Sequence, residues 1–135
     1  MAKLVFTNAY VSVAGVDLSD HVHQFTLSEE AAEVESTAFG VGWRERLGGL
    51  KTGSITIGFH QDFATSSVEA TIGGLLGGTV AVIVQANGST AGTANPKYSM
   101  TALVTSLQPV GGAVGDLLTS DVTWPTTGTV TKAFA

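Results

Sequence analysis

Histidines and carboxylates that stand close together are the residues of this chain that could do chemistry. Asp17, Asp20, His21 and His23 form the densest group. Alternate residues share a strand face, so His21 and His23 could join the carboxylates in a weak divalent-metal site. The same residues also fit a polar strand start with a half-buried His23, and we favour that interpretation. We therefore expect no metal and no cofactor.

A second pair, His60 and Asp62, has the spacing of a general base and the group that orients it. No nucleophile accompanies it, because the chain has no cysteine and no serine stands at a strand-to-helix elbow. We expect a structural hydrogen bond at this pair. The prediction is that the protein is not an enzyme.

An acidic run follows, with no Lys or Arg between Leu4 and Trp43. Its carboxylates could pair as the acid and base of a glycosidase, but no aromatic platform for a sugar accompanies them. A solvated acidic face that repels nucleic acid phosphates is the preferred interpretation. The run is centred on Glu29, Glu30, Glu33 and Glu35.

The positive charge is concentrated in the stretch FGVGWRERLGGLKTG, Phe39–Gly53, which holds five glycines and three of the chain's six basic residues. We predict a long loop here, and a loop of this length in a compact domain is usually functional or disordered. Trp43 beside Arg44 and Arg46 is typical of an interface. The alternative is an ordinary hairpin whose tryptophan folds back onto its own core.

The elements that must position these residues are mostly strands, because apolar and polar residues alternate along much of the chain. Ile55, Ile57 and Phe59 give the clearest pattern. The expected strands are 4–6, 10–13, 23–27, 33–37, 55–59, 79–84, 98–107 and 118–124, with an extended threonine-rich tail over 126–134.

A single helix is expected after the central strand. Ser66 and Glu69 form a capping box, and an apolar stripe follows at helical spacing. Gly77-Gly78 is expected to end the helix. The predicted fold is one domain over residues 1–135, mainly β within the α+β class: an antiparallel β-sandwich or barrel with one flanking α-helix. The stripe is Val68, Ile72, Leu75 and Leu76.

Composition limits the classes of protein. Charged residues make up 13% of the 135 residues and the net charge is −5, whereas about 25% charge is typical. Either Ser, Thr and Gly carry the surface or part of it is buried against partners. Polar residues interrupt the N-terminus and no apolar run is long enough to span a membrane. We expect a soluble protein made in a cytoplasm.

Several blocks in a fixed order resemble the small tail tube proteins (major tail proteins) of tailed bacteriophages, particularly those of actinobacterial phages. The resemblance runs nearly end to end. The blocks are AYVSVAGVDLSDHVHQFTL, EAAEVESTAFG, WRERLGGLKTGSITIGFHQDFA, SSVEATIGGLLG, TVAVIVQ, NPKYSMTALVTSLQPVGGAVGDL and the threonine-rich end.

The resemblance implies a virion structural protein made in the host cytoplasm and located in the tail. In that family, β-sandwich subunits form hexameric rings whose sheets join into an inner barrel, and the rings stack into a tube. DNA passes through the tube at genome ejection without specific binding. The implied partners are further copies of the chain and the terminator, distal tail and tape measure proteins.

For the stretch Phe39–Gly53, the resemblance implies a loop that reaches the adjacent ring, with glycines that let it swing out. The basic residues of the loop would contact acidic residues of a neighbouring copy, at Glu29, Glu30, Glu33 and Glu35. The alternative for these four glutamates is that they line the interior of the tube. The implied contact residues are Trp43, Arg44, Glu45, Arg46, Leu47 and Lys51.

Two other classes remain open at this stage. The first is another small phage structural protein, such as a head decoration or tail-completion protein, which would form trimers or one terminal ring. The second is a monomeric β-sandwich that binds sugar or protein, for which aromatic residues are scarce at 7%.

Overall fold

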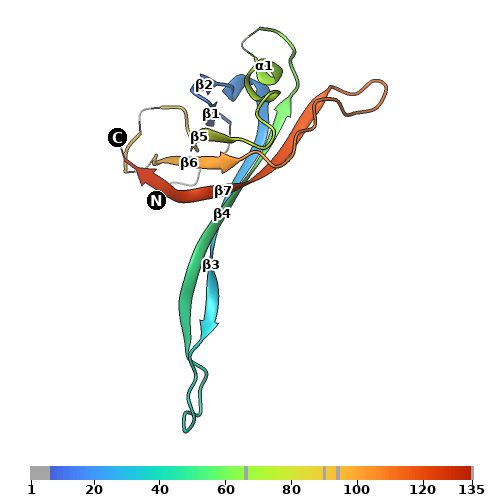
Figure 1. Ribbon diagram of the computed structural model, residues 1–135. Coiled ribbons are helices and arrows are strands. Elements are labelled where there is room, and N and C mark those ends of the chain that lie inside the picture. The colour runs from blue at the N-terminus through green and yellow to red at the C-terminus, as the bar shows by residue number, and fades with distance from the viewer. Residues whose placement is uncertain (1–6, 66, 90, 94, 135) are drawn as a thin grey trace.

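The computed structural model describes residues 7–65, 67–89, 91–93 and 95–134. These residues form a 7-stranded antiparallel sheet in the order β2-β1-β5-β6-β7-β4-β3, with one short helix (Figure 1). This confirms the predicted mainly β fold with a flanking helix. The elements are β1 (Tyr10–Val13), β2 (Val16–Asp17), the 3-10 turn η1 (Ser19–His21), β3 (Val22–Glu35), β4 (Arg46–His60), α1 (Val68–Ile72), β5 (Thr79–Gln85), β6 (Lys97–Leu103) and β7 (Thr119–Ala133).

Strand β7 joins the two halves of the sheet. Residues 119–125 pair with β4, and residues 126–133 pair with β6. A register shift in the second part lies beside Gly128, whose φ of 84° is in the left-handed region that favours glycine. The sequence predicted a strand and a separate tail on either side of Pro125. The structure shows a single strand of 15 residues that changes its partner there.

The core lies between the two halves and follows the period-two pattern of the strands. Trp124 is fully buried, and its Nε1 donates a hydrogen bond of 2.9 Å to the carbonyl oxygen of Ser106. This bond satisfies the polar atom of the largest core side chain. The other buried hydrophobic residues of the described strands are Val11 and Val13 of β1, Ile55, Ile57 and Phe59 of β4, Val80, Val82 and Val84 of β5, Met100 and Ala102 of β6, and Val122 of β7.

A bulge at the start of β3 corrects one prediction. The pairing with β4 shifts between Val22 and Gln24, so that Val22 and Phe25 both pack against the core. The expected inward alternation over 23–27 therefore holds for Phe25 and Leu27 but is wrong for His23, which is exposed. The His23 ring lies over Gly58, where a Cβ would be 2.7 Å from its Cε1 atom.

Helix α1 is shorter than the sequence predicted. Its last residue is Ile72 and Gly73 is its C-cap, so the helix does not extend to Gly77-Gly78. The consecutive glycines Gly73 and Gly74 have a low helical propensity, which explains the early end. Ser67 is the N-cap residue and makes no side-chain cap hydrogen bond; Ser66, the predicted cap, lies outside the described residues, as does the expected strand over 4–6. No helix in the described part of the chain is long and apolar enough to cross a membrane.

One tryptophan is buried and the other is exposed, so their substitution should affect stability differently. Trp124 is 0% exposed and Trp43 is 86% exposed. Trp124→Ala should lower the free energy of unfolding by about 3–5 kcal/mol, because it removes a large core side chain. Trp43→Ala in the dilute monomer should change it by less than about 0.5 kcal/mol. Denaturant unfolding of the two variants measures both values, and equal losses would contradict the described core.

Candidate assembly interface

Strands β3 and β4 run together beyond the body of the molecule as a free-standing hairpin, which we call the arm (residues 29–52; Figure 1). The arm begins where β7 leaves β4, since Ser54 and Pro125 are the last paired residues of those strands. β3 is the edge strand of the sheet. Residues 28–52 are all exposed except Gly49, which is partly buried. Among the described residues, the arm is therefore held by strand pairing and by contacts between its own side chains.

The structure corrects the loop predicted over Phe39–Gly53. Residues 46–53 belong to β4 and pair with β3, so only residues 36–45 form the connecting loop. The backbone N–H of Ser36 donates to the carbonyl oxygen of Glu45 at 2.8 Å, and the Glu45 N–H donates to the Thr37 hydroxyl at 2.8 Å. The glycines at 48, 49 and 53 lie in β4, within the part that pairs with β3. A Cβ at Gly49 would be 3.1 Å from the Val34 side chain, so this glycine allows close packing rather than a hinge.

One face of the arm carries paired charges. Opposed residues of an antiparallel pair share a face, and Glu35 lies opposite Arg46. Arg46 forms a close ion pair with Glu33, and the Arg44 Nε lies 3.7 Å from the Glu35 carboxylate. Arg44 and Arg46 are therefore paired with glutamates of their own chain. Because these pairs are exposed, each contributes only about 0–1 kcal/mol and can be exchanged for another partner.

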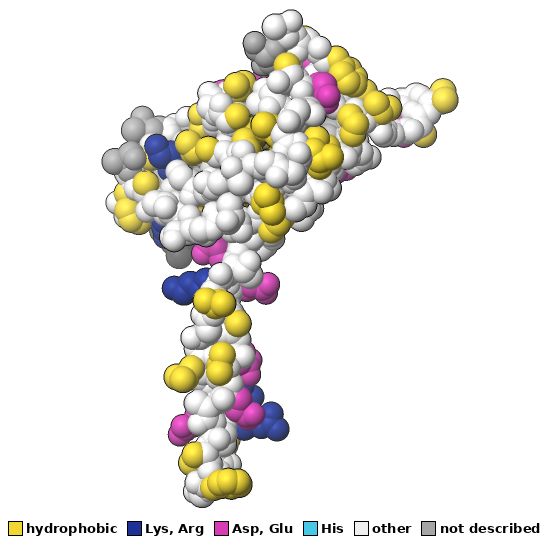
Figure 2. All heavy atoms as spheres, in the orientation of Figure 1, with side chains coloured by type: hydrophobic (Ala, Val, Ile, Leu, Met, Phe, Trp, Pro, Cys, Tyr) yellow, Lys and Arg dark blue, Asp and Glu magenta, His cyan; other side chains and the backbone are white. Residues whose placement is uncertain are grey.

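The other face and the loop of the arm are apolar. Val34 lies opposite Leu47 on the face that carries no ion pair, and Figure 2 shows hydrophobic side chains along the arm and at its end. Exposed apolar groups of this kind mark a surface that associates with a partner. We call Phe39, Val41 and Trp43 the arm tip; they are 106%, 42% and 86% exposed, and Leu47 and Leu50 on the strand are 62% and 90% exposed.

The predicted site residues all lie on this one hairpin. The six expected contact residues occupy the loop and the distal part of β4, and the four glutamates occupy the facing part of β3. Which of them touch a second copy stays a prediction. Val34, Phe39 and Leu50 are exposed on the same hairpin and were not among the predicted contact residues.

A second apolar surface, also missed, lies at the opposite end of β4. His60 at the end of β4 pairs with Thr119, so the segment before β7 returns to this end. Five large apolar side chains of the segments after β4, before β5 and before β7 are exposed. We call them the far-end patch: Phe63, Leu76, Val110, Val114 and Leu117, which are 59%, 63%, 73%, 106% and 65% exposed.

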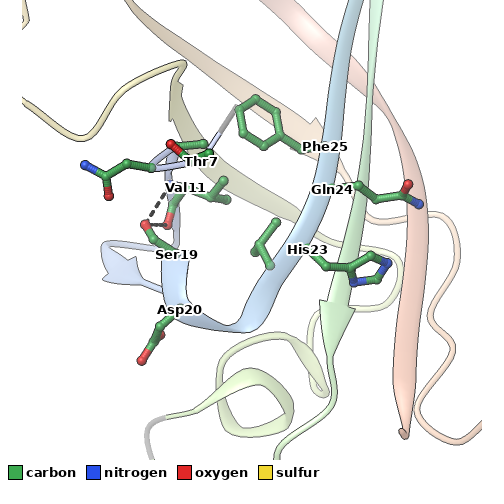
Figure 3. Close-up of a pocket in the computed structure, with 10 residues that line it drawn as sticks. Thr7, Val11, Ser19, Asp20, His23, Gln24 and Phe25 are labelled. Atoms are coloured by element: carbon green, nitrogen blue, oxygen red, sulfur yellow. Dashed lines mark hydrogen bonds between the residues drawn. The ribbon is translucent and has the colours of Figure 1, made fainter. Parts of the chain in front are cut away.

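The histidine and carboxylate candidates do not form one cluster. His21 lies in η1 and not on the strand that carries His23, so the expected shared face is absent. Asp20 and His23 point in different directions (Figure 3). His23 instead stacks on His60, with ring centroids 4.8 Å apart. Within the described ranges, no three His, Asp or Glu side chains are placed to hold a metal ion.

His21 connects η1 to the segment before α1. Its Nδ1 lies 2.9 Å from Asp20 Oδ1, and its Nε2 lies 2.9 Å from Asp62 Oδ2. Asp62 was expected to form a hydrogen bond with His60, but its carboxylate contacts His21 instead. Hydrogen bonding to Asp20, opposed by desolvation and aided by Asp62, raises the pKa of His21. The N–H of Ala64, followed by the Ser67 hydroxyl, lowers the pKa of Asp62.

These pKa shifts predict how stability depends on pH. The stabilisation from His21 is complete below its ordinary value of 6.5 and is lost as the pH rises through the raised folded pKa. The stabilisation from Asp62 is present above 3.8 and is lost as the pH falls through its lowered pKa. His21→Gln should therefore flatten the fall of the melting temperature as the pH rises above 6.5. His23→Gln is the matched control and should keep the fall; an unchanged profile for His21→Gln would contradict the prediction.

Comparisons with known proteins give a likeness of fold. No family model matches the sequence, and no curated protein matches it. A chain of the virion of a native gene transfer agent (GTA) particle aligns with a TM-score of 0.60 and 17% identity, over 84% of this chain and 85% of that chain. A chain of the tail of an empty GTA particle with C6 symmetry aligns with a TM-score of 0.54 and 18% identity, over 82% of this chain and 81% of that chain. Our chain thus shares its fold with chains of phage-like particles over most of both lengths.

Proposed function

We propose that this chain is the structural subunit of a phage-type tail tube, in which hexameric rings stack and enclose a channel for DNA. The observation that carries the proposal is the arm, a hairpin whose apolar tip is exposed and is covered by none of the residues that the structure describes. The likeness to a chain of a C6-symmetric tail supports it. The protein works by assembly and conduction, not by catalysis, and its location is the virion tail.

Ring closure follows from the edges of the sheet. The two edge strands of the described sheet are β2, which has two residues, and β3, which has 14. An exposed edge offers unpaired backbone groups to another chain. A closed ring of copies covers both edges by joining each sheet to the next. Six copies are proposed from the symmetry of the similar tail particle.

Stacking follows from the arm. Its tip and the surface that it binds belong to different parts of the molecule, so the contact is heterologous and repeats without closing. Such a contact generates a filament of rings, which other tail proteins must start and terminate. In the stacked state Arg44 and Arg46 exchange their weak pairs within the arm for acidic groups of a neighbouring copy.

Passage of DNA fits the charge of the chain. Eleven acidic and six basic residues give a net charge of −5. A tube built from such subunits repels phosphates on average, so DNA slides through the channel without specific binding.

Negative-stain electron microscopy of the purified protein, concentrated at neutral pH, tests the proposal directly. Hollow tubes or stacked six-membered rings are the expected result, because the arm and both sheet edges should bind further copies of the chain. Discrete trimers that never stack would replace the tube by a decoration protein. A protein that stays monomeric at high concentration would be less decisive, because other tail proteins start the tube.

A charge reversal on the arm tests its part in stacking. The double variant Arg44→Glu/Arg46→Glu places five glutamates around the loop, together with Glu33, Glu35 and Glu45, and should abolish tubes while the body stays folded. The matched control is Lys97→Glu/Lys132→Glu, which makes the same change of net charge on β6 and β7. Electron microscopy compares the assemblies, and circular dichroism checks the fold. Long tubes from the arm variant would exclude the arm as the stacking element.

A further inference from the structure

A groove runs beside β3 in the body of the molecule. It consists of two hollows that share Phe25, whose ring extends from β3 toward the segment that carries Thr7 (Figure 3). Phe25, Leu27 and Tyr98 are only partly buried, although they pack against the core. Their exposed surface gives the groove an apolar lining, which a further apolar segment could cover.

The outer side of β3 is an edge of the sheet. Among the described residues, β3 pairs with β4 on one side, and no described strand pairs with it on the other. An edge strand beside an apolar groove is the arrangement to which an extended segment binds by adding a strand. Backbone hydrogen bonds hold such a segment, and its alternate side chains enter the groove.

The described chain enters this groove at its first residue, Thr7. The backbone N–H of Val11 donates to the hydroxyl of Ser19, just before β3, at 2.9 Å. The carbonyl oxygen of Asn8 accepts from the N–H of Gly88, beyond the end of β5, at 2.7 Å. Traced backwards, the chain therefore passes from the start of β3 toward the end of β5, whose last residues line the second hollow. A segment that continues beyond Thr7 in this direction runs antiparallel to β3.

Residues 1–6, MAKLVF, are long enough to fill the groove. An extended segment of six residues spans about 20 Å at roughly 3.3 Å per residue. The second hollow follows β3 from Phe25 to Glu29, a stretch of about 13 Å at the same rise. The segment therefore reaches the end of the groove of its own chain from Thr7.

The pattern and the charge of this segment match the groove. Alternate residues of a strand share a face, so Leu4 and Phe6 can enter the groove together while Lys3 points away from it. Glu29 lines the groove, so the next residue, Glu30, points away from it as well. Lys3 is the only Lys or Arg before the arm. In an antiparallel strand it comes beside Glu30, where opposite charges attract.

We propose that residues 1–6, which we call the strap, bind in the groove of their own chain as an additional strand antiparallel to β3. Phe6 lies against Phe25, and Leu4 lies against Leu27. The strap covers the edge of β3 that a neighbouring copy needs for ring closure, so it leaves the groove when a ring forms. This release rests on the proposed function, whereas the binding of the strap does not.

A disulfide between the strap and β3 tests the binding, because the native chain has no cysteine. In Val5→Cys/Thr26→Cys the two thiols lie opposite one another on the side away from the groove, with Cβ atoms about 5 Å apart, near the separation that a disulfide requires. The matched control is Val5→Cys/Thr101→Cys, with the second thiol at an exposed position of β6. Oxidation of the dilute monomer by diamide should close the 5–26 disulfide within one chain about tenfold faster or more, because binding raises the effective concentration of the thiols. Equal rates in the two variants would overturn the strap.

Hydrogen exchange supplies a second readout on the monomer. Leu4→Ser/Phe6→Ser removes the side chains that enter the groove, and it should speed the exchange of the β3 amides that face the strap by about tenfold or more. Val5→Ser changes the opposite face of the strap and should leave their exchange unchanged. The same exchange in both variants would contradict the binding.

The oxidised protein also tests the release of the strap. Under conditions in which the unmodified chain forms tubes, oxidised Val5→Cys/Thr26→Cys should form none by electron microscopy, and reduction should restore them. Tubes from the fully oxidised protein would overturn the release and leave the binding intact. Discrete trimers of the unmodified chain would remove the proposed ring closure and the release with it, while the disulfide rates still decide the binding in the dilute monomer.

Discussion

The departure of β7 from β4 at Pro125 is the constraint on which the rest of the structure depends. Up to that point β4 has a partner on each side and contributes its buried residues to the core. Beyond it β7 crosses to β6 and closes the sandwich, and β4 continues with β3 alone. Pro125 lacks the N–H that a longer ladder would use. One change of partner thus creates both the joined sheet and the arm.

Contacts within the arm contribute little to its stability, as is expected of a segment that is stabilised by binding a partner. Two-stranded ribbons are only marginally stable by themselves. Here the ribbon continues from a strand that is anchored in the core by Ile55, Ile57 and Phe59, so its base is fixed. Its ion pairs are exposed and contribute little, and its apolar groups remain in contact with water. The free energy that the arm can gain lies mainly in contacts outside its own chain, which is the physical basis of the assembly proposal.

The sequence predicted the features that local patterns determine. Period two identified the buried face of β4, and composition with alternation identified the mainly β fold. Prediction from the sequence failed where pairing between residues that are distant along the chain determines the local structure. Gly48, Gly49 and Gly53 favoured a loop, but all three lie in β4, which pairs with β3. Neighbouring atoms come close to Gly49 and Gly53, which leaves little room for a side chain at those two positions. The bulge at His23 has no local signature either.

The candidate site was predicted in part for the same reason. Trp43 and the clustered bases marked the correct segment, since their types are unusual in so weakly charged a chain. The far-end patch escaped notice because its members come from separate segments that only the fold brings to one end. These side chains are exposed because no other described element covers them. A local sequence pattern does not predict which elements cover a residue.

The free edge of β3 has a further consequence, for aggregation. Within the described residues, the arm part of β3 (residues 29–35) has no strand on its outer side, and it is a template on which a second β3 could add. Two β3 strands that pair in this way bring their glutamates together, and like charges opposite one another destabilise a sheet. The acidic run thus guards the chain against amyloid-like self-pairing while it is free in solution. The guarding side chains are Glu29, Glu30, Glu33 and Glu35.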